Sequence, residues 1–146
     1  ADNEYLHKDF HGALNCGIRY LHEHFGEEAV RHYLRDFARE YYAPLRERLK
    51  TDGLSALRQH FESIYRAENA SFSFAQSAEE LTLTIDACPA VTHIRSLGDT
   101  PCELFVETTR TVNQTICEDT PYEAQLLSYD EQTGASAQRF SRRQSS

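Results

Sequence analysis

The chain has 146 residues and a formal charge of -8, because 23 acidic residues outnumber 15 Lys and Arg. Its length fits one domain, spanning residues 1–146, that is large enough to bury a core. The negative charge argues against nucleic acid or an anionic membrane as a partner, since phosphate binding needs clustered Lys and Arg. The sequence shows no apolar stretch of transmembrane length, and its first residues are too polar for a signal peptide.

The four cysteines, Cys16, Cys88, Cys102 and Cys117, stand at irregular spacings without a C-x-x-C pair. This is neither a zinc-ribbon pattern nor the cysteine density of a small secreted domain. We therefore expect reduced thiols in a cytoplasmic protein, although an even number of cysteines also permits disulfides. Because Met and Trp are absent, the core must rest on aliphatic residues and on the eight Phe and eight Tyr.

Apolar residues at helical spacing predict a first helix over residues 4–25, with Gly26 as its C-cap. At about 100° per residue, His7 falls within the apolar stripe of this helix and His11 falls on its flank. Cys16 points to the opposite side, where we expect it to be exposed.

Two further helical segments follow. The second helix begins near Glu27 and breaks at Pro44, with a short continuation over residues 45–50. A third helix runs to about Ala67, and Asp52 is placed to cap its N-terminus.

The pattern then changes to alternation of apolar and polar residues, which predicts strands at residues 72–74 and 81–88. A period of two places Cys88 on the face that carries Thr84 and Asp86, and Pro89 ends the strand.

A fourth helix is expected over residues 101–117, followed by a hairpin with strands at 122–129 and 135–142. The predicted architecture is α+β, with N-terminal helices followed by an antiparallel sheet of about four strands and one inserted helix.

His7 and His11 lie four residues apart on one helix, so their rings can converge on one point. This spacing suits two metal ligands, or a base with its orienting partner. A third metal ligand would come from a distant segment, with Cys88, His93 and Glu118 as candidates. The more ordinary interpretation is two hydrogen-bonded histidines at the edge of the core. We assign no cofactor, and a divalent metal remains the alternative.

The segment from Cys88 to His93 places a thiol at a strand end, five residues before an imidazole. A turn at Pro89 would let His93 fold back, so that the two form a thiolate nucleophile and its base. The ordinary alternative is a small half-buried cysteine and a surface histidine.

Polar residues of the fourth helix and the last strand offer further candidates. Thr109 and Asn113 share one flank of the helix and could bind a polar substrate group, with Cys117 just beyond them. Glu118 could act as a general base if partly buried. Arg139, followed by two more arginines, could hold a carboxylate through paired N–H donors. Exposed solvation, and a charged strand that discourages edge pairing, are the commoner explanations.

Several short motifs together resemble one known family. They are Tyr5–Asn15 (YLHKDFHGALN), residues 25–30 (FGEEAV), Cys88-Pro89-Ala90, Glu107-Thr108-Thr109-Arg110, Cys117-Glu118, and the hairpin ends Tyr129-Asp130 and Gln138-Arg139-Phe140. Spread over most of the chain, they resemble the L-2-amino-thiazoline-4-carboxylic acid hydrolase-like family. That family is similar in layout to vinyl-reductase-like small-molecule-binding domains, which are α+β ligand pockets and not always enzymes.

The resemblance implies hydrolytic opening of a cyclic, amidine-like C–N bond in a small heterocycle derived from an amino acid. It suggests acid–base or metal work for His7 and His11, a nucleophile or pocket-wall role for Cys88, and a secondary catalytic role for Glu118. The substrate-binding set that goes with these roles is Asn15, His93, Thr109, Asn113, Cys117 and Arg139.

A second interpretation is a non-catalytic binding or sensor module for a small ligand, with a homodimer through Tyr41 and Tyr42 as one option. A third is another reaction on the same scaffold, such as an accessory biosynthetic step. An enzyme needs polar groups to converge within about 3–4 Å in a closed pocket. A binding module needs only an apolar cavity with one or two anchors. The catalytic hypothesis therefore requires His7, His11, Cys88 and Glu118 to meet in one interior hollow.

Overall fold

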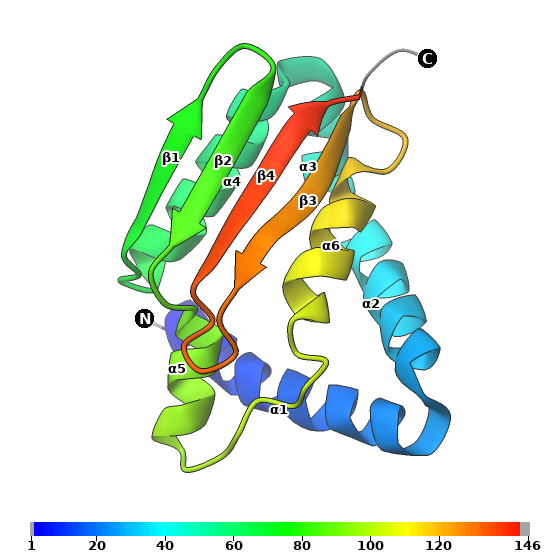
Figure 1. Cartoon of the computed structure of the whole chain (residues 1–146), viewed down its shortest axis with the longest axis vertical. Coiled ribbons are helices and arrows are strands. Elements are labelled where there is room, and N and C mark those ends of the chain that lie inside the picture. The colour runs from blue at the N-terminus through cyan, green and yellow to red at the C-terminus, as the bar shows by residue number, and fades with distance from the viewer. Residues whose placement is uncertain (1, 144–146) are drawn as a thin grey trace.

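The computed structural model describes the backbone of residues 2–143 and the side chains of residues 11–143. Within them the chain forms a four-stranded antiparallel sheet with helices on one face, which confirms the predicted α+β architecture. The elements are α1 (Asp2–Phe25), α2 (Glu27–Tyr41), α3 (Ala43–Asp52), α4 (Leu54–Ala67), β1 (Phe72–Gln76), β2 (Glu80–Ile85), α5 (Pro89–Ser96), α6 (Glu107–Cys117), β3 (Tyr122–Tyr129) and β4 (Ser136–Arg142). In Figure 1, α3 and α4 lie behind the sheet, α6 lies between β3 and α2, and α1 crosses one end.

The sheet has the order β1-β2-β4-β3, so β4 is a central strand between β2 and β3. Leu83 of β2 pairs with Gln138 of β4, and Leu81 pairs with Phe140. All four of these side chains are buried on the face that the helices cover, because alternate residues of a strand point to the same side. This face of the sheet forms one wall of the core.

Helical periodicity predicts the N-terminal helices well, with two differences at their ends. Phe25, the apolar residue that ends the predicted first helix, is 67% exposed, because it is the last residue before the chain turns at Gly26. Asp52 is the last residue of α3 and makes no side-chain cap, since Gly53, with a φ of 73°, stands between α3 and α4. Cys16 is exposed, as expected, and all four cysteines are free.

Helix α5 is the main departure from the predicted elements. The strand predicted to reach Cys88 ends at Ile85, and Cys88 is the N-cap of α5. Pro89 occupies the first turn of α5, where its missing N–H has no intrahelical partner to lose. Two helices, α5 and α6, therefore lie between β2 and β3, and α6 begins at Glu107 rather than near residue 101.

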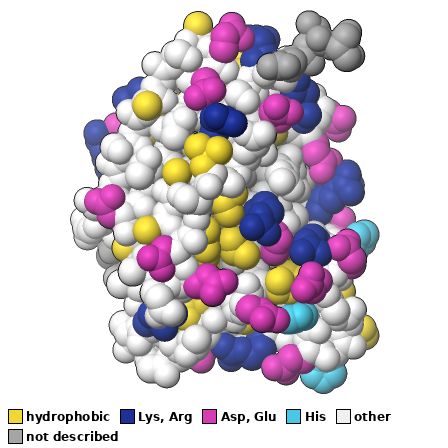
Figure 2. Space-filling model, viewed as in Figure 1, with side chains coloured by type: hydrophobic (Ala, Val, Ile, Leu, Met, Phe, Trp, Pro, Cys, Tyr) yellow, Lys and Arg dark blue, Asp and Glu magenta, His cyan; other side chains and the backbone are white. Residues whose placement is uncertain are grey.

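No helix within residues 2–143 is long and apolar enough to cross a membrane. On the face seen in Figure 2, acidic and basic side chains are interspersed, and histidines show only at its lower right, over the region of α1 and α2 in Figure 1.

Candidate functional site

A cavity of about 520 Å³ lies on the helix-covered face of the sheet. Its walls come from α1, α2, α4, α6, the N-terminus of α5 and one residue of β4. Most of the lining is apolar or aromatic, with rings such as Phe37, Phe61 and Tyr65. A cavity of this size with a few polar groups suits a small organic ligand.

A histidine and a glutamate from distant parts of the chain meet at the wall of this cavity. His11 Nε2 and Glu68 Oε1 are 2.9 Å apart, and their side chains are only 12% and 10% exposed. A carboxylate in this position orients an imidazole. His11 is one of the catalytic candidates, whereas no sequence signal marks Glu68. The other histidine of the predicted pair, His7, has a side chain outside the described ones.

Cys88 also lines the cavity, next to Pro89 and Ala90. Burial raises the pKa of its thiol, outweighing hydrogen bonds from the Val91 and Ala90 amides that lower it. The charge of Glu68 raises this pKa further. Cys88 is therefore a protonated thiol at neutral pH, which makes it a poor nucleophile by itself.

Two buried amides form a further polar part of the cavity wall. Asn113 Nδ2 donates to Gln138 Oε1 at 2.7 Å, and Gln138 Nε2 donates to Ser136 Oγ at 3.0 Å. Asn113 and Gln138 line the cavity, as does the predicted substrate-binding residue Thr109. Sequence analysis assigns no site role to Gln138, because it is one polar residue in an alternating strand.

His60 and Tyr42 add a neutral aromatic wall. Their rings stand edge to face with centroids 5.5 Å apart, and both residues line the cavity. Burial raises the pKa of Tyr42 to about 12. Tyr41 also lines the cavity, with its ring centroid 4.9 Å from that of Tyr42, but most of its surface is exposed.

The pKa of His60 leads to a testable effect on stability. Burial, helped by the charge of Arg48, lowers this pKa from 6.5 to about 4, so between these values the unfolded chain binds more protons than the folded chain. The contribution is present above pH 6.5 and is lost as the pH falls towards 4, by up to about 3 kcal/mol at 1.36 kcal/mol per pKa unit. Urea denaturation from pH 7 to pH 4 should show a shallower loss of stability for His60→Gln than for the unmodified chain.

A matched control is His32→Gln, because His32 is an exposed histidine paired with Asp36 at 3.3 Å. This variant should keep the full pH dependence. Equal pH slopes for His60→Gln and the unmodified chain would contradict the buried, neutral state of His60.

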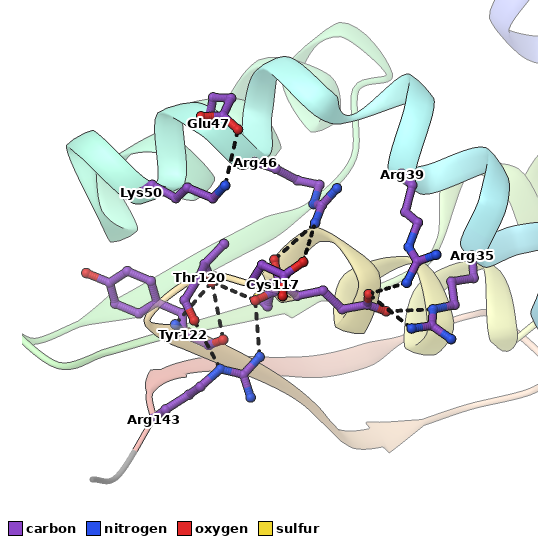
Figure 3. Close-up of polar contacts among 11 residues, drawn as sticks. Arg35, Arg39, Arg46, Glu47, Lys50, Cys117, Thr120, Tyr122 and Arg143 are labelled. Carbon is purple, nitrogen blue, oxygen red and sulfur yellow. Dashed lines mark hydrogen bonds and ion pairs between the residues drawn. The ribbon is translucent and has the colours of Figure 1, made fainter.

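Glu118 does not reach the cavity, contrary to the catalytic hypothesis. Its carboxylate accepts hydrogen bonds from Arg35 Nε at 2.8 Å and Arg39 Nη2 at 2.9 Å on the outer surface of α2. Burial opposes its ionisation, but the hydrogen bonds from both arginines outweigh it and hold the pKa below its usual value. Glu118 therefore holds α2 against the end of α6, and Figure 3 shows the contacts that Arg35 and Arg39 make there.

Cys117 also belongs to the end of α6 rather than to the cavity. Its side chain is fully buried, burial raises the pKa of its thiol to about 12, and its carbonyl accepts hydrogen bonds from Thr120 Oγ1 and Arg143 Nη2. Arg46 Nη2 donates to the next carbonyl, that of Glu118, at 3.1 Å. Cations at the last carbonyls of a helix stabilise it, so these contacts cap α6.

The remaining predicted binding residues, Asn15, His93 and Arg139, do not line the cavity. Asn15 is buried and ties α1 to the loop before α6, donating to the Thr100 carbonyl at 3.1 Å and accepting from the Cys102 amide at 2.9 Å.

His93 lies within α5 and Arg139 within β4. Arg139 alternates with the inward Gln138 and Phe140, so it points away from the helices and hydrogen-bonds Gln125 of β3. Because β4 is central, edge protection does not explain Arg139 either.

Within residues 11–143 no group of three or more His, Cys, Asp or Glu side chains is arranged to hold a metal ion. Of the three candidates for a third ligand beside the histidine pair, Cys88 alone lines the same cavity as His11.

Comparison with known proteins finds no relative, since no family model, curated protein or solved structure matches the chain.

Proposed function

We propose that the chain is a small-molecule hydrolase that opens a cyclic, amidine-like C–N bond, with His11 and Glu68 as its acid–base pair. The observation that supports this most is the hydrogen bond between His11 Nε2 and Glu68 Oε1, 2.9 Å long, at the wall of a cavity of about 520 Å³. An imidazole oriented by a carboxylate is a standard general base, and the cavity is large enough for a heterocyclic substrate.

In the proposed reaction, the lone pair of water attacks the ring carbon while His11 takes one proton from that water. A C–O bond forms, and the negative charge of Glu68 stabilises the imidazolium that results. The electron pair of the C=N bond moves to the ring nitrogen, which accepts that proton from His11. His11 then takes the remaining proton of the new hydroxyl group and passes it to the same nitrogen, so that a C=O bond forms as the C–N bond breaks. The net change is the addition of one water molecule.

We assign the attack to water rather than to Cys88. Burial raises the pKa of the Cys88 thiol, and the nearby charge of Glu68 raises it further, so little thiolate is present at neutral pH. Cys88 is instead proposed as part of the cavity wall.

The aromatic wall supports a second function, that of a non-catalytic module for a small ligand. Tyr42, His60 and Phe61 enclose the cavity with rings, and His60 is neutral there because burial lowers its pKa to about 4. Such a wall binds flat ligands without any chemistry. Saturable binding with no change in the mass of the ligand would favour this function over hydrolysis.

The test is to incubate the protein with a set of cyclic amidines, including thiazolines and imidazolines, and to follow the gain of one water by mass spectrometry. The hydrolase proposal expects enzyme-dependent gain of water with at least one ring class. Val112 lines the cavity from α6, so Val112→Phe should fill part of it and weaken binding by at least about tenfold.

The control enlarges an exposed residue, Leu127→Phe on β3, and should leave ring opening and binding unchanged. Ring opening that survives Val112→Phe at full rate would place the reaction outside this cavity.

A further inference from the structure

The amide of Asn113 is held in one orientation by buried neighbours. Asn113, Gln138 and Ser136 are 8%, 2% and 6% exposed. The chain of bonds runs from Asn113 Nδ2 to Gln138 Oε1, and from Gln138 Nε2 to Ser136 Oγ. Since the Gln138 oxygen accepts from Asn113, the nitrogen of Asn113 faces Gln138 and its oxygen is directed elsewhere.

A third neighbour supports this arrangement. The side chain of Tyr65 is half-buried, lines the cavity and hydrogen-bonds the Gln138 side chain. Burial raises the pKa of Tyr65 well above its usual value, as does the nearby Cys88, and the bond to Gln138 lowers it by less. Tyr65 is thus a neutral phenol at every physiological pH, and its contact with Gln138 does not change with pH.

The side-chain oxygen of Asn113 is left as an open acceptor. Asn113 lines the cavity, and none of the described residues donates a hydrogen bond to its Oδ1. The buried side-chain atoms without a partner within residues 11–143 are Arg46 Nε and Arg139 Nε, so Asn113 Oδ1 is not sealed inside the protein. It is an acceptor that a ligand in the cavity can reach.

We propose that Asn113 determines the specificity of the cavity, because its side-chain oxygen accepts a hydrogen bond from an N–H group of the ligand. The cavity then selects heterocycles that carry an amino group over isosteres that carry a methyl group in its place. This inference rests on the proposed function only in that the cavity holds a small ligand, and it does not require turnover.

The size of the preference follows from the cost of an unmade hydrogen bond. A methyl ligand covers Asn113 Oδ1, removes water from it and offers no donor in return. Leaving a buried acceptor unsatisfied weakens binding by about tenfold or more. The opposite amide orientation would present N–H groups to the ligand and would remove or reverse the preference.

The test uses 2-aminobenzothiazole and 2-methylbenzothiazole, which differ in the single donor group, and measures the dissociation constant of each by NMR titration of the full chain. The expected result is that the amino compound binds about tenfold more tightly or better. Equal affinity, tighter binding of the methyl compound, or no binding of either would overturn the proposal.

Variants of neighbouring residues on α6 locate the effect. Asn113→Leu keeps the size of the side chain and should bring the ratio of the two dissociation constants close to one. Gln114→Leu removes the amide of the next residue, which is exposed and does not line the cavity, and should keep the ratio. Asn113→Asp retains an acceptor and should keep the preference, which tests the idea even if Asn113→Leu does not fold. A full preference in Asn113→Leu would overturn the assignment.

The outcomes separate this inference from the proposed reaction. A preference for the amino compound without ring opening of any heterocycle supports the role of Asn113 and removes the hydrolase. Ring opening that is equally fast for substrates with and without an N–H donor supports the hydrolase and removes the role of Asn113.

Discussion

Glu68→Gln is expected to lower the rate of ring opening by at least about 100-fold, the smaller end of what general acid–base catalysis contributes. Glutamine has nearly the same shape as glutamate and keeps an oxygen for the hydrogen bond with His11. It has no charge to stabilise the imidazolium that forms when His11 takes a proton from water. The free energy of unfolding should change little, so the loss belongs to the chemistry. The measurement is steady-state turnover of the best substrate, with thermal unfolding as the check on folding.

His11→Gln should show a loss of similar size, and the double variant should be little worse than either single one, because the two side chains act as a unit. The control is His22→Gln on the same helix, since His22 pairs with the exposed Glu103 at 3.5 Å and does not line the cavity. This control should keep full activity. If Glu68→Gln retained more than about a third of the activity, the proposed acid–base pair would be wrong.

Gly134→Ala is expected to lower the free energy of unfolding by about 3 kcal/mol or more, from combined backbone strain and overpacking. Gly134 has a φ of 75°, a conformation that side chains with a Cβ rarely adopt. An added Cβ would lie 2.4 Å from Cys88 Cβ and 2.9 Å from Val91 Cγ2. Neither atom is the end of a flexible side chain, so the backbone must move. Urea denaturation measures the change.

Gly98→Ala is the matched control, because Gly98 has a similar φ of 80° but an added Cβ there would meet nothing within 4 Å. Gly98→Ala should lower the free energy of unfolding by about 1 kcal/mol, the strain of the positive φ alone. The difference between the two variants isolates the close approach of the β3–β4 turn to Cys88. Equal losses of stability would show that this approach is not tightly packed.

The contact at Gly134 also concerns the cavity. The Cys88 amide donates to the Thr133 carbonyl at 2.9 Å, so the β3–β4 turn holds the N-terminus of α5 in place. Figure 1 shows this turn lying against α5 at the end of the sheet. Because Cys88, Pro89 and Ala90 form one wall of the cavity, a shift at Gly134 should also weaken ligand binding.

Much of the fold can be predicted from local patterns. The spacing of Leu14, Ile18 and Leu21 predicts α1, and the alternation through Leu81, Leu83 and Ile85 predicts β2. These patterns work because the period of a helix or a strand decides which residues face the core. The error at α5 has a local cause as well. Pro89 ends a strand and begins a helix equally well, and only the apolar spacing of Ala90, Val91 and Ile94 favours the helix.

Local sequence patterns predict less of the candidate site than of the fold. His11, Cys88, Thr109 and Asn113 can be singled out by residue type and spacing, and all four line the cavity. Glu68 cannot, because it lies 57 residues from His11 and becomes its partner only when the C-terminal end of α4 comes close to His11 in the folded chain. Glu118 has the residue type of a general base, but its carboxylate forms ion pairs with Arg35 and Arg39 of α2, outside the cavity.

The sequence by itself determined which segments are helices and strands and which of their faces are apolar, since short-range periodicity sets both. The tertiary structure alone decided which carboxylate meets His11, which amide orients Asn113, and that Cys117 and Glu118 serve the end of α6. Such pairings depend on contacts between residues far apart in the chain. The same polar residue type is a solvated surface group in one packing and a cavity group in another.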